Sequence, residues 1–144
     1  MKRKWFFVIL FLVLAIFVSG CSGGGIITPA TGENQKEEIK AIVTNYWLAL
    51  SNREYELAKT YCVPNGKAYQ AVEEYQSMPY LESSTLTWTP YFNSIIITGN
   101  NANVNMDITL IVTVCFENIC SDASETLRNF FMYLTITNGI WKLK

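Results

Sequence analysis

Residues 102–116 read Ala-Asn-Val-Asn-Met-Asp-Ile-Thr-Leu-Ile-Val-Thr-Val-Cys-Phe, and this stretch decides the fold. From Ala102 to Phe116 every second side chain is apolar, while most of the side chains between them are polar. Successive side chains of a strand point to opposite faces of a sheet. The alternation therefore predicts a long strand with one buried face.

A second strand is expected immediately before this stretch. Residues 84–98 are rich in Thr, aromatic residues and Ile, and Gly99-Asn100-Asn101 is typical of a tight turn. Pro90 lies inside the predicted strand and has no backbone N–H to donate. It therefore indicates an edge position or a bulge.

Two more strands are expected after the long one. The chain is predicted to turn over residues 117–124 and to form a third strand over residues 126–137. The apolar side chains on one side of that strand are Phe130, Met132, Leu134 and Ile136. Asn138-Gly139 is typical of a hairpin turn, and residues 140–143 form the last strand. These patterns predict a meander of four antiparallel strands.

The segment before the sheet has a helical period. Asn34 and Glu37 resemble a capping box, which predicts a first helix over residues 34–51. Apolar side chains recur along one face of this helix at Ile39, Ile42, Val43, Tyr46, Trp47 and Leu50. Asn52 is expected to cap a shorter second helix with Glu54 in its first turn.

A third helix is predicted over residues 67–78 and is closed by Pro79. The residues of this helix that are spaced for burial are Ala68, Ala71, Val72 and Tyr75. An amphipathic helix and a one-faced sheet both need a partner surface, and a curved sheet wrapped around the first helix provides it. The fold class is therefore α+β, with three helices packed on about four strands.

Three segments resemble the NTF2-like superfamily of α+β cones. They are residues 42–50, which end an apolar helix, residues 52–58, which enter the next helix with Ala58 inward, and residues 137–143, a hairpin in which Trp141 follows the turn. The resemblance implies a cone that can enclose a pocket. Members include isomerases, dehydratases and transport adaptors, so the fold does not fix the function. A cystatin-like arrangement is the alternative fold.

The first residues are typical of a secretory signal. Met1-Lys2-Arg3-Lys4 is followed by the uncharged, apolar run Trp5–Val18, which is shorter than the ~20 residues of a spanning helix. Val18-Ser19-Gly20-Cys21 resembles the lipobox of bacterial lipoproteins, which implies cleavage before Cys21 and lipid on its thiol. An ordinary signal peptide with an incidental cysteine is the alternative.

The expected organisation is a cleaved signal over residues 1–20, a lipidated cysteine with a flexible tether over 21–33, and one domain over 34–144. The lipid on Cys21 would hold the chain to a membrane in the cell envelope, outside the cytoplasm. Ser22 is not the aspartate that in many double-membrane bacteria retains lipoproteins at the inner membrane. In such an organism the outer membrane is therefore expected.

Composition excludes several classes of function. Three of the 11 Lys and Arg lie in the signal, which leaves eight against 12 acidic residues, a formal net charge of −4 and no basic patch for nucleic acid. The chain contains no histidine, so it lacks the commonest general base and the usual metal ligand. No metal and no cofactor is expected, and a non-catalytic role is favoured.

Three cysteines remain after Cys21, namely Cys62, Cys115 and Cys120, and three thiols allow three alternative single bridges. Cys115 and Cys120 flank four residues where the chain is expected to reverse, so this pair is favoured. Cys62 is then expected to be a small buried apolar residue.

The candidate pocket residues are Tyr46, Trp47 and Tyr61, which lie on inward helical faces. Asp107 is the carboxylate of the long strand, but its side chain is expected to point away from the apolar face and into solvent. Two functions follow. One is a non-catalytic envelope domain that binds a partner protein or a small apolar ligand in the cone. The alternative is an enzyme like a ketosteroid isomerase or a dehydratase, which would use Tyr and a carboxylate.

Overall fold

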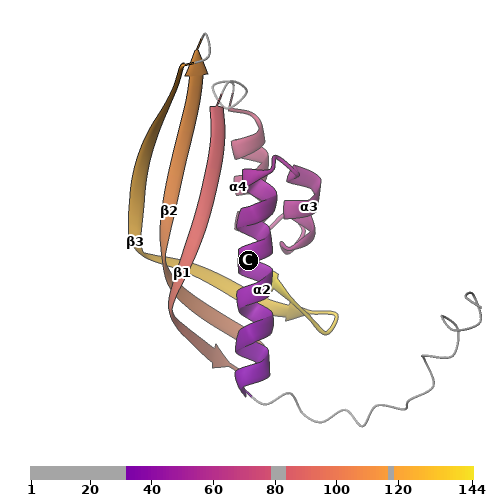
Figure 1. The fold of residues 1–144 in the computed structure, drawn as a ribbon. Coiled ribbons are helices and arrows are strands. Elements are labelled where there is room, and N and C mark those ends of the chain that lie inside the picture. Colours follow the sequence, from indigo (N-terminus) through magenta and orange to yellow (C-terminus); the bar gives the residue numbers. More distant parts are fainter. Residues whose placement is uncertain (1–31, 79–83, 117–118) are drawn as a thin grey trace, which may run out of the picture.

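The computed structural model describes residues 32–78, 84–116 and 119–144. The predicted signal, Cys21 and nearly all of the predicted tether lie outside these residues. Three helices pack against one side of a four-stranded antiparallel sheet, and the sheet curves around the first of them (Figure 1). Within the described part of the chain, no helix is long and apolar enough to cross a membrane.

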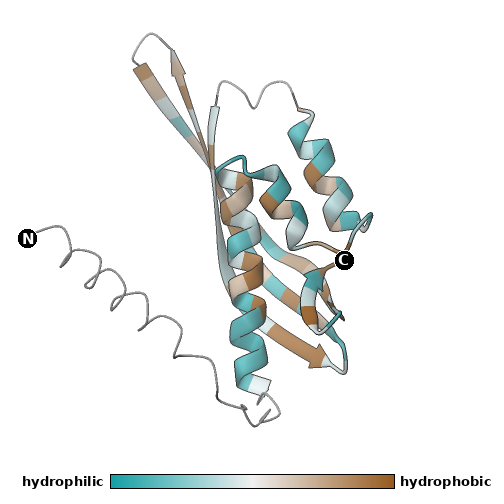
Figure 2. Ribbon diagram, turned by 90° about the vertical axis from the view of Figure 1, so that its right-hand side faces the viewer, coloured by the Kyte–Doolittle hydropathy of each residue, from teal (hydrophilic) through white to brown (hydrophobic). Residues whose placement is uncertain are grey.

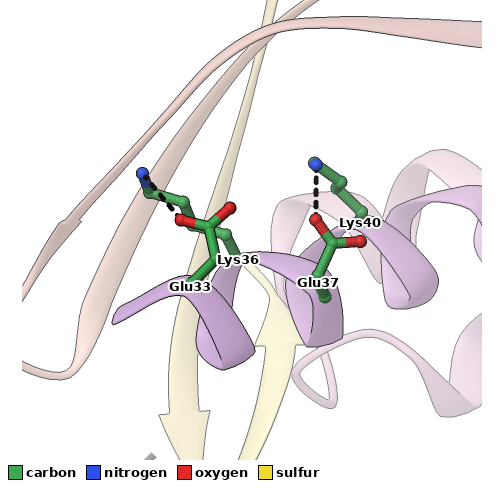
Figure 3. A network of polar contacts seen from close by, with 4 residues as sticks. All are labelled: Glu33, Lys36, Glu37 and Lys40. Atoms are coloured by element: carbon green, nitrogen blue, oxygen red, sulfur yellow. Dashed lines mark hydrogen bonds and ion pairs between the residues drawn. The ribbon is translucent and has the colours of Figure 1, made fainter. Parts of the chain in front are cut away.

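The first helix, α2, spans Gly32–Ser51 and so begins ahead of the predicted start at Asn34. The predicted capping box is therefore wrong, because Asn34 and Glu37 lie inside the helix. Glu37 instead accepts a hydrogen bond of 2.6 Å from Lys40, and Glu33 lies 3.8 Å from Lys36 (Figure 3). Such pairs at i,i+3 support the added turn on an exposed helix surface, although each contributes only a few tenths of a kcal/mol.

The second helix, α3, spans Tyr55–Thr60 and is not capped by Asn52 as expected. Asn52 still belongs to the end of α2, because its N–H donates to the Leu48 carbonyl at 2.9 Å. Arg53 then takes a left-handed φ of 61°, and its guanidinium donates to the carbonyl of Ser84. This bond ties the end of α2 to the first strand. The third helix, α4, spans Lys67–Gln76.

The sheet consists of β1 (Ser84–Thr98), β2 (Asn101–Phe116), β3 (Ile119–Thr137) and β4 (Ile140–Leu143), in that order. The predicted meander is confirmed, and so is the edge position of Pro90, because β1 pairs only with β2. The predicted turn over residues 117–124 is wrong, since β3 already begins at Ile119. β2 and β3 stay paired up to the end of β2 and the start of β3, where Phe116 lies opposite Ile119.

The disulfide between Cys115 and Cys120 is confirmed. The two residues lie directly opposite each other on β2 and β3, with their Cα atoms 4.0 Å apart. The bridge therefore fixes the pairing of the strands at the end of the hairpin. Cys62 is free and buried, as predicted.

The core lies between α2 and the concave face of the sheet. Ile39 and Val43 of α2 meet a layer of fully buried strand residues, which are Val104, Met106, Ile108 and Leu134. Beyond Ile108 the same face of β2 loses its cover, because Leu110 and Val112 are only half-buried and Val114 is 46% exposed. The far ends of β2 and β3 project past the helices (Figure 2). One end of the concave face is thus open.

Two bulges meet at Asp107 on the convex face. β1 has an extra residue, Asn93, and β3 has an irregularity between Leu127 and Phe130 opposite Asp107. Asp107 Oδ1 accepts hydrogen bonds from the side chain of Asn93 and the backbone N–H of Asn129, both at 2.9 Å. The side chain points away from the core, as predicted, but it holds together two bulges that bend the sheet.

Asp107 is expected to make the fold sensitive to acid. The N–H of Asn129, and then the amide of Asn93, lower the pKa of Asp107 below its ordinary value of 3.8. A carboxyl group with a lowered folded-state pKa stabilises the fold fully above the unfolded-state pKa, and this contribution disappears as the pH falls through the folded-state value. An NMR titration should place the midpoint of Asp107 below 3.8, and Asp107→Asn should flatten the acid dependence of the thermal midpoint. A midpoint at or above 3.8 would contradict the proposed role, and Asp122→Asn provides a charge control on the same face.

Candidate functional site

An aromatic cluster lies at the open end of the sheet and is centred on Trp47. The ring of Trp47 lies 5.3 Å from Tyr46, 5.0 Å from Trp88 and 6.1 Å from Phe130, measured between centroids. Ser51 holds α2 against β1 beside this cluster. Its hydroxyl donates to the Trp47 carbonyl and accepts from the backbone N–H of Trp88, both at 3.0 Å. The cluster thus joins α2, β1 and β3 and separates two hollows.

The first hollow, here called the concave groove, has a volume of about 360 Å³. Its lining residues are Tyr75, Met78, Ser84, Leu86, Trp88, Leu110 and Val112. The indole N–H of Trp88 donates to the hydroxyl of Tyr75 at 3.2 Å, so these two polar atoms satisfy each other. Apolar hollows of this size with few polar groups are typical of sites for small molecules.

The second hollow, here called the edge groove, has a volume of about 300 Å³ and lies between α2, α4 and β3. Tyr46, Trp47, Lys67, Ala68, Ala71, Phe130, Phe131, Met132, Tyr133, Leu143 and Lys144 line it. Two of the predicted pocket residues, Tyr46 and Trp47, therefore border a hollow. The third, Tyr61, packs at the end of α3, where its carbonyl accepts from the Leu143 N–H at 2.9 Å. Ala71, expected to be buried, is exposed in the groove wall.

The titratable groups near the cluster are poorly suited to acid–base chemistry. Burial, and to a smaller extent the nearby Cys62, raises the pKa of Tyr46 above its ordinary value of 10.0. Burial likewise raises the pKa of the Cys62 thiol to about 12. Both groups stay protonated near neutral pH, so neither is a base or a thiolate nucleophile there.

The indole N–H of Trp47 has no partner in the described part of the chain, although its nitrogen is buried. Trp47 is 8% exposed. A buried donor without an acceptor is costly and uncommon in a folded protein. Its presence in the wall of a groove is consistent with an acceptor supplied from outside the domain.

Within the part of the chain that the structure describes, no acidic side chain lines either groove. Glu125 lies on the concave side of β3, opposite Leu110, but it is exposed and is not part of the concave-groove lining. Among residues 32–78, 84–116 and 119–144, no group of three His, Cys, Asp or Glu side chains could hold a metal ion. The described lining of the concave groove is therefore mostly apolar.

Solved structures with the same arrangement of helices and strands identify the fold. An NTF2-like superfamily protein from Salmonella enterica matches 78% of this chain and 88% of its own, with a TM-score of 0.58 and 16% identity. The fold is NTF2-like. A ketosteroid isomerase-like protein from Erwinia carotovora atroseptica matches 74% of this chain and 88% of its own, with a TM-score of 0.55 and 13% identity.

A third NTF2-like structure is described as having a cystatin-like fold. It comes from Novosphingobium aromaticivorans and matches 83% of this chain and 87% of its own, with a TM-score of 0.52 and 10% identity. No protein-family profile matches the chain, and no curated protein is similar to it in sequence. At these identities the NTF2-like likeness defines the fold alone.

The concave groove contains residues that the sequence did not identify as a site. Tyr75 and Trp88 were expected only as core residues, and Leu110 and Val112 only as part of the long strand. The apolar pattern of β2 continues past Ile108, whereas no helix follows it there. An apolar strand pattern longer than the helix that covers it was the available signal of an open apolar face, and the sequence analysis did not use it.

Proposed function

We propose that this chain is a lipid-anchored protein of the cell envelope whose NTF2-like domain binds a small apolar molecule in the concave groove without transforming it. The observation that carries this proposal is the lining of the groove. Among the described residues, its side chains are apolar except for Ser84 and for the Tyr75 hydroxyl, which accepts from Trp88, and none of these lining residues carries a carboxylate or an ammonium group. Such a surface favours an apolar ligand, because burying it removes apolar area from water.

The anchor in this proposal is the lipid on Cys21. The supporting pattern is the lipobox-like sequence that ends at Cys21, followed by Ser22-Gly23-Gly24-Gly25 as a spacer. Residue 22 is serine, so the outer membrane is the proposed location in a bacterium with two membranes. The domain would then bind its ligand beside a lipid surface.

A second candidate is an isomerase or dehydratase of the ketosteroid isomerase type. One observation favours it, namely the hydroxyl of Tyr75 in the wall of the concave groove. Such chemistry also needs a base within reach of the substrate. Among the described residues, Glu125 is a carboxylate that pairs in register with a groove residue, Leu110, but its side chain is exposed. Binding without catalysis is therefore the favoured function.

Leu110 and Ile111 allow a matched test, since they are adjacent on β2 and point to opposite faces. The domain over residues 34–144, produced without the signal and Cys21, would be titrated with N-phenyl-1-naphthylamine, whose fluorescence rises in an apolar site. Leu110→Arg should weaken binding by about tenfold or more, because a charged group at the groove must stay hydrated. Ile111→Arg should leave binding unchanged. Equal binding by both variants, or no binding by the parent chain, would refute the concave groove as a ligand site.

A further inference from the structure

β1 forms one outer edge of the sheet, and β3 forms the other wherever the short β4 does not pair with it. The end of α2 lies against the first residues of the outer edge of β1, because Ser51 and Arg53 bond to the backbone of Trp88 and Ser84. The outer edge of β3 pairs with β4 only over Leu134–Thr137, and the N–H of Lys144 adds one bond to the Tyr133 carbonyl. Within the described residues, β3 has no strand partner on that side from 119 to 132. An open edge of this length is a template for another strand.

The edge groove runs along this open edge. Four consecutive residues of β3, Phe130 to Tyr133, line the same hollow. Successive side chains of a strand point to opposite faces, so a hollow that all four border must follow the edge of the strand. A neighbouring hollow of about 450 Å³ shares Lys67, Tyr133 and Lys144 with it and reaches Thr135, where β3 is already paired with β4.

The opposite wall of the edge groove leaves room for a backbone. It is formed by α4, whose contributions include the small side chains of Ala68 and Ala71. The start of α4 is fixed beside the end of β4, since the Ala68 N–H donates to the Lys144 carbonyl at 3.0 Å. A side chain at Gly66 would meet the Val63 carbonyl oxygen at 3.0 Å. The start of α4 is therefore held close to Val63 and Lys144.

The side chains in the groove indicate the chemistry of its occupant. Lys67 and Lys144 border both hollows, and the ion pairs found in the described part of the chain use other lysines. Next to them are the apolar surfaces of Trp47 and Phe130 and the buried N–H of Trp47. An extended backbone supplies carbonyl acceptors and donors for an open strand edge, and a carboxylate complements the two ammonium groups.

We infer that the edge groove binds an extended segment of a partner protein, which pairs with β3 as an added strand and places an acidic side chain against Lys67 and Lys144. This site is distinct from the concave groove, and it does not depend on the ligand proposed there. Main-chain bonds to β3 would supply much of the affinity, while the lysines and the aromatic floor would select the sequence.

The test uses the mature chain and a phage library of random 12-residue peptides, with Ala71→Trp as the blocked variant. We expect the parent chain to enrich peptides in which every second side chain is apolar and which contain Asp or Glu. Loss of that enrichment on Ala71→Trp, but not on Gln70→Trp, would support the site. No enrichment over the blocked variant would overturn the proposal.

Synthetic peptides from the library would then separate strand pairing from other modes of binding. N-methylation of the peptide backbone should weaken binding by about tenfold or more at alternate positions only, because one edge of a strand faces β3. Lys67→Glu should weaken binding by about tenfold and should be rescued by a peptide with Lys in place of its acidic residue, whereas Lys36→Glu should not change it. Uniform sensitivity to N-methylation, or no rescue, would overturn the inference.

Two further measurements exclude other occupants. Leu110→Arg should leave peptide binding intact, so failure of the concave groove and failure of the edge groove are distinguishable. Analytical ultracentrifugation of the mature chain should show a monomer. A dimer that Ala71→Trp dissociates would overturn the inference in favour of a second copy of this chain.

Discussion

Ile108→Ala is expected to lower the free energy of unfolding by about 3–4 kcal/mol, which lies in the range for removing a buried aliphatic side chain. Ile108 is fully buried on the concave face of β2, where it lies between Pro90 of β1 and Leu127 of β3. The substitution removes three carbon atoms from a layer that α2 and the sheet share. The cavity is expected to stay empty, because strand pairing on both sides prevents collapse.

Ile111→Ala is the matched control for this prediction. It makes the same chemical change on the same strand, but Ile111 lies on the convex face and is 37% exposed. Its cost should be less than about 1 kcal/mol, mostly from a lower preference for strand structure. Chemical denaturation should therefore separate the two variants, and Ile108→Ala should lower the thermal midpoint by roughly 12 °C or more. Similar losses in both variants would mean that the concave face of β2 is not the core.

The helices and the long strand could be predicted because burial imposed a period on them. Val43 and Trp47 of α2, and Met106 of β2, each face a covered surface, and their spacing reveals which face that is. β3 could be predicted only from residue 126 onward. Its residues 119–125 are exposed on both faces, so no periodic pattern marks them as a strand. Pairing with β2 and the Cys115–Cys120 bridge hold them in the sheet instead.

The candidate sites were predictable only in part, for a related reason. The inward positions of Tyr46 and Trp47 follow from helical spacing, but a groove is a space between elements that are distant in the sequence. Trp88 bonds to Tyr75 because α4 ends beside β1, and Lys67 and Lys144 line one groove because α4 begins beside the end of β4. No local sequence pattern predicts which residues of distant elements line the same groove. The open edge of β3 depends on the shortness of β4, and so it became visible only once the register was known.

Cys21→Ala, produced behind an ordinary cleavable secretory signal in place of residues 1–20, is expected to transfer the entire mature protein from the membrane to the soluble fraction. The substitution removes the thiol that the proposed lipid would occupy, and no helix in the described residues could serve as a substitute anchor. One acyl chain binds a membrane only marginally, whereas several give stable attachment, so loss of the lipidated cysteine should act as a complete switch. Labelling with radioactive palmitate and fractionation would measure it. A labelled membrane form that persists in Cys21→Ala would refute the anchor.

Two variants show whether that effect belongs to Cys21 itself. Cys62→Ala removes a different thiol, one that is buried in the core, and should leave labelling and membrane attachment unchanged even if it lowers stability. Ser22→Asp retains the lipid but places an aspartate directly after the lipidated cysteine. In a host with two membranes, this variant should therefore move the protein from the outer to the inner membrane. If the parent chain already fractionates with the inner membrane, the proposed location is wrong while the anchor stands. The domain would then still lie between the two membranes, but beside the inner membrane, and its two grooves would meet the ligands found there.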